Sequence, residues 1–346
     1  TLKHIKGRVS MISYIRNVTI FTLLLSFASL SESKLLRFAI VPKEENNPFF
    51  EASREGCMDA AKELKNVECV YRGPKSVDIR KQDKIISDLL DEGIDGIAIA
   101  VPQGKFMLEH SMQKVQELGI PVITYDADFS TETLSRYPKL RAAYIGTNDF
   151  DLGKALGEQL KSQLPNGGTI LIQSGRPDSP NLNLRVMGIR SALSGKEYEL
   201  PPGKRLKGEN GWTEFSKPLH NFGQFDRALE DLKNVLNSYQ EREINAIVAV
   251  GGWTQFLEEY RDVVTPHKQA ILDKDIVIIT ADTAQEQLVY LKDNLAHGNV
   301  GQNPYEMGKQ AILTLYKLVN KQAVEEVMYI PMTYCTPDNY QSCTKN

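Results

Sequence analysis

The sequence predicts an α/β fold made of two successive lobes, each a doubly wound parallel sheet. From residue 36 onward, short apolar runs rich in β-branched residues alternate with amphipathic stretches, which is the pattern of repeated βα units. The alternation reaches residues 141–147, then starts again, so one sheet is expected to be complete before the next begins. At 346 residues, with 41% hydrophobic and 25% charged residues, the chain is long enough for two cores.

The first lobe is expected to contain five strands. They are predicted at residues 36–41, 67–71, 94–101, 120–126 and 141–147. The run at 94–101 is almost continuously apolar, as in a strand that is covered on both faces. Polar residues predict a loop at 127–139, and apolar residues at helical spacing predict three helices, at 50–65, around Ile85 to Leu90, and at 105–118.

The second lobe repeats the pattern with strands at 168–174, 246–251, 276–282 and around Val300. Prolines and glycines interrupt residues 194–223, where we expect an irregular elaboration with one extended segment near 205–207. A shorter irregular stretch is expected around His267. Helices are predicted at 149–164, 181–193, 225–238, 284–293 and 305–319.

Residues 1–33 differ from the rest of the chain. A basic stretch, an apolar run from about Val18 to Leu30 and small residues at 31–33 follow one another, which predicts a secretory signal peptide. An uncleaved membrane anchor is the alternative, although the apolar run is short for a membrane-spanning helix. The protein is therefore expected to be exported through a cleaved signal peptide.

Four cysteines are present, and disulfides persist in an exported protein. Because the partners are close in sequence, we predict the bridges Cys57–Cys69 and Cys335–Cys343, although four cysteines allow three pairings. No Cys-x-x-Cys occurs and the five histidines are scattered singly, so neither zinc nor another metal is expected.

The formal charge of -3 and the absence of a long basic cluster argue against nucleic acid or an anionic membrane as a partner.

The ends of the predicted strands indicate a ligand site. Open α/β sheets bind ligands beyond the carboxyl ends of their strands, and two lobes that face each other would line one cleft. The stretch Asn46-Asn47-Pro48-Phe49-Phe50 follows the first strand and offers amides beside aromatic faces, which suits a polyhydroxylated ring. Asp126 and Asp282 end later strands and can accept bonds from neighbouring hydroxyls.

Six segments in the same order resemble a known family. They are residues 46–50, 120–126, 145–149 and 185–188, with Asp282 and Gln302. Over residues 35–330 the chain resembles the ribose-binding-protein group of type I periplasmic solute-binding proteins. The resemblance implies two lobes joined by three crossing segments, with the first lobe at 34–147 plus 303–330 and the second at 148–302 plus 331–346.

The resemblance also implies roles for individual residues. Phe49 and Phe50 would stack on the sugar ring. Trp253 lies where the chain departs from the family pattern, and it is expected to add another stacking face. The remaining expected ligand-binding residues are Asn47, Asp126, Thr147, Arg185, Asp282 and Gln302.

Structural roles compete with these assignments. Asp126 and Asp282 could cap the helix or turn that follows each of them. One of the two phenylalanines is expected to be mainly core, and Arg185 could lie on the surface of its helix. Trp212 either covers the cleft mouth or packs in the interior.

The sequence departs from the ribose binders at Val101, Ala127 and Gly252, where the family pattern usually has polar residues. The ligand is therefore expected to be a sugar or polyol other than plain ribose.

The expected function is a monomeric receptor that binds a sugar or sugar-like polyol and delivers it to the membrane permease of an ABC transporter. The alternative is a ligand receptor for a sensor kinase or chemoreceptor. An enzyme is disfavoured because the sequence lacks Gly-x-Ser-x-Gly, His-Glu-x-x-His and a phosphate loop, and no cofactor is expected. A transcription repressor is disfavoured by the signal peptide and the lack of an amino-terminal helix-turn-helix domain.

Overall fold

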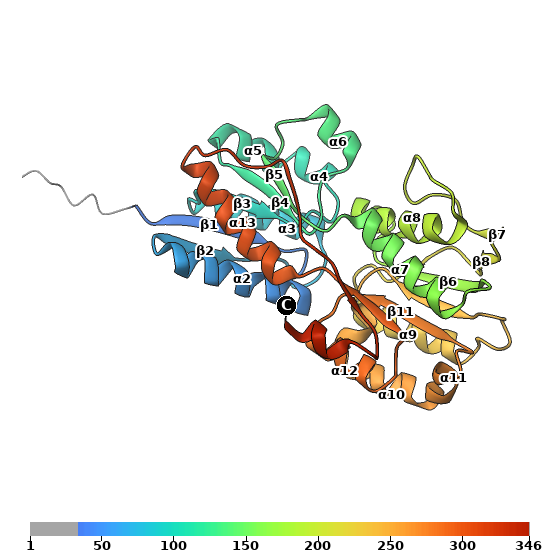
Figure 1. The fold of residues 1–346 in the computed structure, drawn as a ribbon. Helices are drawn as coiled ribbons and strands as arrows, with labels where there is room; N and C mark the ends of the chain where they lie inside the picture. The colour runs from blue at the N-terminus through green and yellow to red at the C-terminus, as the bar shows by residue number, and fades with distance from the viewer. Residues whose placement is uncertain (1–33, 346) are drawn as a thin grey trace, which may run out of the picture. The chain divides into compact units, whose positions relative to one another are not determined.

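A six-stranded parallel sheet forms the centre of the first lobe (Figure 1). The computed structural model describes residues 34–345, so the predicted signal peptide lies outside the described residues. Within that range no helix combines the length and the apolar character needed to cross a membrane. The strand order is β13-β5-β4-β3-β1-β2, with β1 (Leu36–Val41), β2 (Val67–Tyr71), β3 (Gly96–Ile99), β4 (Val122–Tyr125), β5 (Ala143–Gly146) and β13 (Val327–Tyr329).

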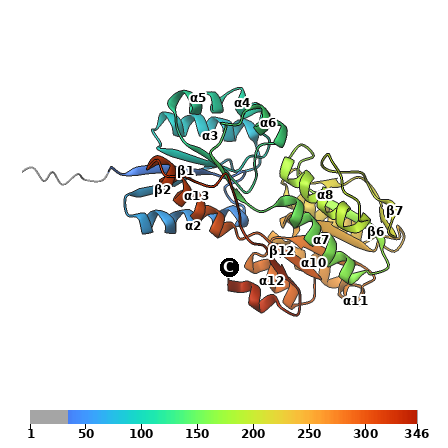
Figure 2. The same cartoon turned by 45° about the horizontal axis from the view of Figure 1, so that its top comes forward.

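Helices cover both faces of this sheet (Figure 2). Alternate strand residues point to opposite sides, so that Phe38 and Ile40 pack under one helical layer while Ala39 and Val41 pack under the other. The predicted coverage of both faces is therefore confirmed. One layer consists of α2 (Pro48–Leu64) and α13 (Pro304–Val319), and the other of α3 (Ile79–Asp91), α4 (Lys105–Leu108) and α5 (Ser111–Leu118).

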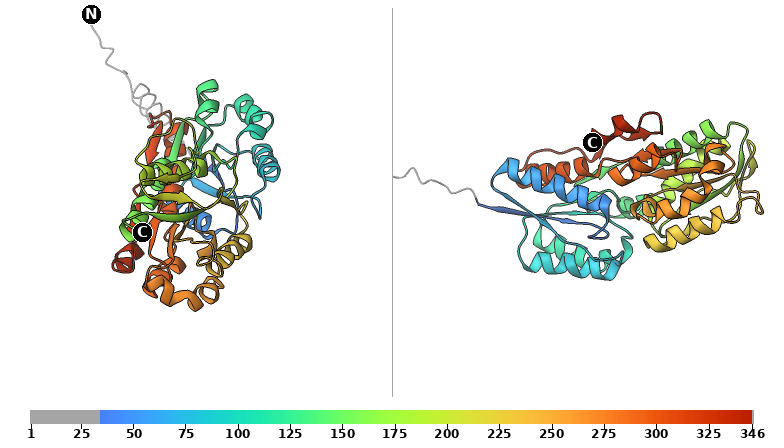
Figure 3. Two further views of the ribbon diagram at one scale, coloured as in Figure 1. Left: turned by 90° about the vertical axis from the view of Figure 1, so that its right-hand side faces the viewer. Right: turned by 90° about the horizontal axis from the view of Figure 1, so that it is seen from below.

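The second sheet has eight strands in the order β14-β12-β11-β10-β6-β8-β7, with β9 beside β6. Its central strands β6 (Gly168–Ser174), β10 (Ala246–Ala249), β11 (Val277–Ala281) and β12 (Gly298–Gly301) run parallel to one another, and β14 (Thr333–Cys335) runs antiparallel to β12. One layer contains α7 (Asp149–Gln163) and α8 (Pro180–Ser194). The other contains α9 (Phe225–Leu236), α10 (Tyr260–Val264), α11 (Lys268–Leu272) and α12 (Gln285–Lys292). The left view of Figure 3 looks at this lobe from its end.

The chain passes between the two sheets three times. It crosses between β5 and α7, between β12 and α13, and finally between β13, which belongs to the first sheet, and β14, which belongs to the second. The predicted fold class of two doubly wound lobes with three crossings is confirmed.

Two secondary-structure predictions in the first lobe were wrong, one of a helix and one of a loop. The expected continuous helix at 105–118 is broken between α4 and α5, because the N–H of Ser111 donates to the carboxylate of Asp83 at 3.1 Å, a partner outside the helix. The expected loop at 127–139 contains the short helix α6 (Thr131–Arg136), which begins where the Ser130 hydroxyl accepts from the N–H of Thr133.

The elaboration at 194–223 forms more strand than expected. β7 (Lys207–Glu209) and β8 (Trp212–Glu214) are joined by a tight turn at Asn210 and Gly211, both with positive φ, and β9 (Leu219–His220) pairs with β6. Strands of two or three residues are too short to show a period-2 pattern. Trp212 is buried in the second-lobe core, so it packs in the interior.

Both predicted disulfides are present. Cys57 in α2 bonds to Cys69 in β2, and Cys335 in β14 bonds to Cys343 in the short helix η3 (Tyr340–Lys345).

We predict that replacing both Cys57 and Cys69 with alanine lowers the free energy of unfolding by about 3 kcal/mol, the chain-entropy value for a loop of this length. Chemical denaturation of the variant and the wild type measures the difference. The double alanine variant of Cys335 and Cys343 opens a shorter loop, so by the same entropy argument it should lose slightly less stability. A first-bridge variant no less stable than wild type would contradict the prediction.

A buried histidine makes the stability of the second lobe depend on pH. The ring of His297 accepts from the N–H of Ile278 through Nδ1, while Nε2 lies 2.9 Å from the carbonyl of Ile271 and must donate to it. Burial lowers the pKa of His297 to about 4, so the folded state holds the neutral ring.

Because the unfolded chain binds this proton near pH 6.5 and the folded chain near pH 4, the stabilisation is complete above pH 6.5 and is lost as the pH falls towards 4. At about 1.4 kcal/mol per pH unit the loss is about 3 kcal/mol. We predict that wild type loses this much more stability than His297→Gln between pH 7.5 and 4.5, as measured by urea unfolding. Parallel pH profiles for the two proteins would refute the assignment.

Candidate functional site

A single pocket at the carboxyl ends of both sheets collects most of the predicted ligand-binding residues. Eight of the nine line it: Asn47, Phe49, Phe50 and Asp126 from the first lobe, and Arg185, Trp253, Asp282 and Gln302 from the second lobe and its crossing segment. Thr147 is buried at the end of β5 and is not among the lining residues. The strand-end rule therefore located the pocket from the sequence.

Asp126 and Asp282 occupy equivalent places in the two lobes. Asp126 follows β4 with φ 58° and Asp282 follows β11 with φ 71°. The N–H of each donates to the adjacent strand, to the carbonyl of Ile145 and of Val300 respectively. A non-glycine residue in this conformation is strained, and such strain is concentrated at functional sites. Neither carboxylate caps a helix, because Asp282 accepts from the backbone of Gly252 and Asp126 pairs with Lys43.

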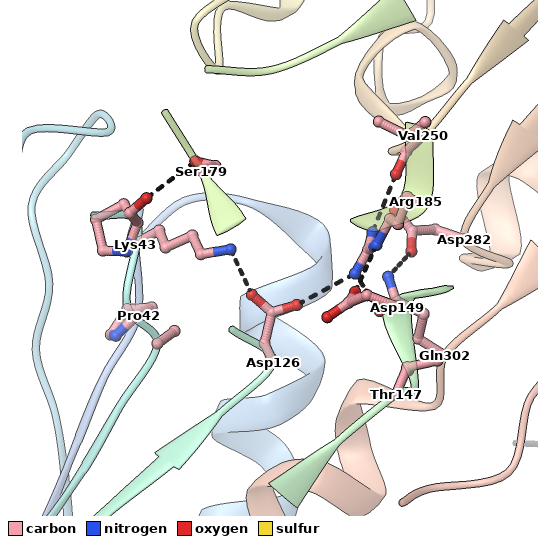
Figure 4. Close-up of polar contacts among 12 residues, drawn as sticks. Pro42, Lys43, Asp126, Thr147, Asp149, Ser179, Arg185, Val250, Asp282 and Gln302 are labelled. Atoms are coloured by element: carbon pink, nitrogen blue, oxygen red, sulfur yellow. Dashed lines mark hydrogen bonds and ion pairs between the residues drawn. The ribbon is translucent and has the colours of Figure 1, made fainter. Parts of the chain in front are cut away.

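Lys43 and Asp126 form an ion pair in the first-lobe wall of the pocket. The Lys43 ammonium lies 2.8 Å from Oδ2 of Asp126, and both side chains are largely buried (Figure 4). The sequence reasoning missed Lys43. Its place directly after the first strand was the available signal, because strand ends were already the candidate positions.

Arg185 lies at the centre of the second-lobe side and is buried in α8, so the alternative of a surface arginine is wrong. Its Nε donates to Asp149 at 2.7 Å, and its two terminal nitrogens donate to the carbonyl of Val250 at 3.0 Å and to Gln302 at 2.7 Å. The same guanidinium approaches Asp126 of the first lobe to 3.9 Å (Figure 4).

Gln302 connects Arg185 to the second carboxylate. While its oxygen accepts from Arg185, its Nε2 donates to Oδ1 of Asp282 at 2.6 Å. The other carboxylate oxygen of Asp282 accepts from the N–H of Gly252 at 2.9 Å. The crossing residue Gln302 therefore orients both charged groups of the second lobe.

Burial opposes ionisation of the carboxylates in this network. It raises the pKa of Asp149 to about 6, an effect that Arg185 partly offsets, and it also raises the pKa of Asp282. Burial alone would lower the pKa of Arg185, but the neighbouring carboxylates of Asp149, Asp126 and Asp282 raise it. The positive charge of the Arg185 guanidinium therefore stabilises the ionised form of these carboxylates in the interior.

Close helix packing brings Arg185 to Asp149. A Cβ on Gly153 of α7 would overlap the carbonyl of Arg185, and one on Gly188 of α8 would overlap the carbonyl of Phe150. Glycine at these positions lets the two helix backbones approach directly. Asp149, which the sequence indicated only as the first residue of a helix, is thereby placed beside the arginine.

Aromatic rings form the apolar part of the pocket wall. Phe49 and Phe50 meet edge to face with centroids 5.2 Å apart, and both belong to the first-lobe core while also lining the pocket. The expected division into one core ring and one ligand ring is therefore not seen. Trp253 is packed against Gly175 and Gly251, where a Cβ would contact the indole, so the glycines make room for this ring.

Further lining residues were not foreseen besides Lys43, among them Glu44, Ser179, Asn181 and Phe256. Asn47 has a second role, because its side-chain oxygen accepts from the N–H of Phe49 and caps α2. Glu44 follows Lys43 and could have been found by the same strand-end rule. Asn181 and Phe256 lie in a helix and a 3-10 turn, where nothing in the sequence marks them as pocket residues.

Direct contacts join the two lobes around the pocket. The Ser179 hydroxyl of the second lobe donates to the carbonyl of Pro102 in the first lobe at 2.9 Å. Gly223 lies so close to Val77 that a Cβ at residue 223 would contact the valine side chain. Arg185 of the second lobe also approaches Asp126 of the first. With these contacts the two lobes are closed around the pocket.

Comparison with known proteins agrees with this geometry. A family model described as a periplasmic binding protein domain matches residues 38–323. The chain belongs to the periplasmic binding protein family. The predicted resemblance is confirmed, and relatives of this periplasmic binding protein carry the names of sugar-binding proteins.

Two curated relatives show the degree of similarity. The xylose/arabinose-binding protein of Sulfolobus acidocaldarius is 25% identical over 176 residues, which cover 49% of this chain and 42% of the relative. The D-ribose/D-allose-binding protein of Pseudomonas aeruginosa is 26% identical over 159 residues, which cover 45% of this chain and 49% of the relative. The chain thus spans about half the length of these two relatives.

A solved structure matches over nearly the whole fold. The ABC transporter solute-binding protein from Burkholderia graminis, in complex with D-arabinose, is 24% identical with a TM-score of 0.73. The match covers 90% of this chain and 99% of that structure, and it shows that the two share a fold.

We predict that Lys43→Met lowers the free energy of unfolding by about 3 kcal/mol, because it leaves the buried Asp126 carboxylate without its ion-pair partner. Chemical denaturation measures the change. The double variant Lys43→Met with Asp126→Asn should recover much of the loss, since no unpaired charge remains. Equal losses in the single and double variants would show that the ion pair does not determine the stability of this wall.

Proposed function

We propose that the protein is a periplasmic receptor that encloses a sugar or sugar-like polyol between its two lobes. The observation that carries the proposal is the pair of strained carboxylates, Asp126 and Asp282, which approach one pocket from opposite lobes beside the rings of Phe49 and Trp253. Carboxylates bind vicinal hydroxyls through charge-assisted bonds, and aromatic rings pack against the apolar face of a sugar.

The remaining predicted residues act in two ways in this proposal. Asn47 and Phe50 contact the ligand from the first lobe, while Arg185 and Gln302 bind it and also orient Asp282. Thr147 acts through the crossing segment, because it is not in the pocket wall.

Closure is the proposed mechanism. The lobes are taken as residues 34–147 plus 303–330 and 148–302 plus 331–346, with hinges near Thr147, Gln302 and Pro331. The assignment of β13 to the first sheet and β14 to the second supports this division. A ligand that contacts both lobes favours the closed state, since only that state makes both sets of contacts.

The proposed partner is the membrane permease of an ABC transporter, which receives the ligand from a monomeric receptor after export through a cleaved signal peptide. A sensor kinase or chemoreceptor would use the same ligand site. The family consists of solute-binding proteins, and the proposed function needs no catalysis and no cofactor.

A thermal-shift screen of the purified protein over pentoses, hexoses and polyols tests the proposal. Ligand at 100 times its Kd stabilises the folded state by about 2.7 kcal/mol, which raises the melting temperature measurably. The Asp126→Asn and Asp282→Asn variants should lose the shift, because each removes a charged acceptor from the pocket.

Asp151→Asn is the matched control, because this carboxylate is exposed on α7 outside the pocket, and it should bind as wild type does. If no polyhydroxylated compound of any kind raised the melting temperature, the proposed function would be wrong. Unchanged binding in both pocket variants would instead reject the assigned residues.

A further inference from the structure

Carboxylates outnumber cations among the buried and half-buried side chains in and beside the pocket. Lys43 and Arg185 are the buried cations, and their bonds go to Asp126, Asp149, Gln302 and a backbone carbonyl. Four carboxylates accompany them: Asp126, Asp149, Asp282 and Glu44. Arg176 also lines the pocket, but it pairs with Asp178 in a bidentate contact near the surface.

Asp282 has no ion pair with these cations, but it accepts bonds from Gln302 and from the N–H of Gly252. Glu44 has no ion pair with them either among the described residues. It lines the pocket directly after Lys43, and the Asn47 side chain is its hydrogen-bond donor. Its Oε2 atom is buried and has no hydrogen-bond partner among the residues that the structure describes. Burial raises the pKa of Glu44, and the hydrogen bond from Asn47 offsets this effect only in part.

Asn181 supplies a second acceptor of the same kind from the other lobe. It is 3% exposed and lines the same pocket from the first turn of α8. Its side-chain oxygen is buried without a hydrogen-bond partner in the described part of the chain. A buried polar atom left unpaired costs about 1–3 kcal/mol, so a ligand that donates to it gains affinity.

These acceptors select among ligands by charge. A hydroxyl can donate one hydrogen bond to Glu44 but leaves the excess negative charge in place. An ammonium group offers three donors and one positive charge, so it satisfies the free acceptors and also neutralises the carboxylate. A carboxylate or phosphate on the ligand would add to the excess charge and would be rejected.

We propose that the ligand is an amino sugar, or an amino polyol, whose protonated amine binds Glu44 and is further held by Asn181. This inference rests on the proposed sugar-binding function and narrows its ligand class. In this proposal Asp126, Asp282 and the aromatic rings bind the hydroxylated part of the ligand, while Glu44 binds its amine.

Matched ligand triads test the inference by isothermal titration calorimetry at pH 7. Each triad compares one sugar with its 2-amino and 2-acetamido forms: glucose with glucosamine and N-acetylglucosamine, and likewise for galactose and mannose. Glucitol and 1-amino-1-deoxyglucitol extend the series to polyols, and glucuronate serves as the anionic probe.

In at least one series the amine should bind about ten-fold or more tightly than its neutral counterpart, the size of one charge-assisted bond. The isosteric variant Glu44→Gln should bring the ratio of the amine affinity to the neutral-sugar affinity close to one, because it removes the charge and keeps the shape. Asn181→Ala should weaken the amine in the wild-type background. Glu55→Gln, an exposed carboxylate on α2 outside this pocket, is the control and should keep the preference.

Neutral sugars that bind as tightly as their amines, with no effect of Glu44→Gln on the ratio, would overturn the inference and leave the sugar receptor standing. Tighter binding of glucuronate than of the amines would also overturn it. Failure of every sugar, polyol and amine to bind would instead overturn the proposed function and this inference with it. Circular dichroism and melting of each variant show that it is folded.

Discussion

The buried guanidinium of Arg185 is the interaction on which the site depends. It bonds the start of α7 through Asp149, the end of β10 through Val250 and a crossing segment through Gln302, so one side chain joins three separate parts of the second lobe. Isolated, a buried charge of this kind would be expensive, and its partners make it tolerable. Because Gln302 also donates to Asp282, the position of the Asp282 carboxylate in the pocket follows from the position of the arginine.

The two lobes use the same backbone arrangement to place side chains at the pocket. In each, an aspartate with positive φ follows a central strand and is held by the carbonyl of the neighbouring strand. In each, two helices approach backbone to backbone at glycines, at Gly56 and Gly308 in the first lobe and at Gly153 and Gly188 in the second. Such close contact restricts the positions of the helices. The amino ends of α2, α7 and α8 therefore place Asn47, Asp149 and Asn181 close to the pocket.

Internal pairing decides which polar groups remain for a ligand. Asp126 is engaged by Lys43, and Asp282 is engaged by Gln302 and Gly252. The acceptors of Glu44 and Asn181 have no such partner among the described residues. A family resemblance identifies the shared residues of the pocket, but the chemistry of this ligand depends on the balance of charges that these additional residues create.

The fold could be predicted from the sequence, because the alternation of apolar runs and amphipathic stretches is a local property of the chain. The same pattern placed Asp126, Asp282 and the 46–50 motif at strand ends. The sequence also predicted both disulfides from close spacing. It could not show the break before Ser111, which a carboxylate 28 residues earlier causes, nor the burial of Arg185 and Trp212. Asn181 and Phe256 enter the pocket only because helices and turns from distant parts of the sequence meet there. Which polar atoms are paired, and which are left for a ligand, depends on contacts between residues far apart in the chain, and only the tertiary structure decided it.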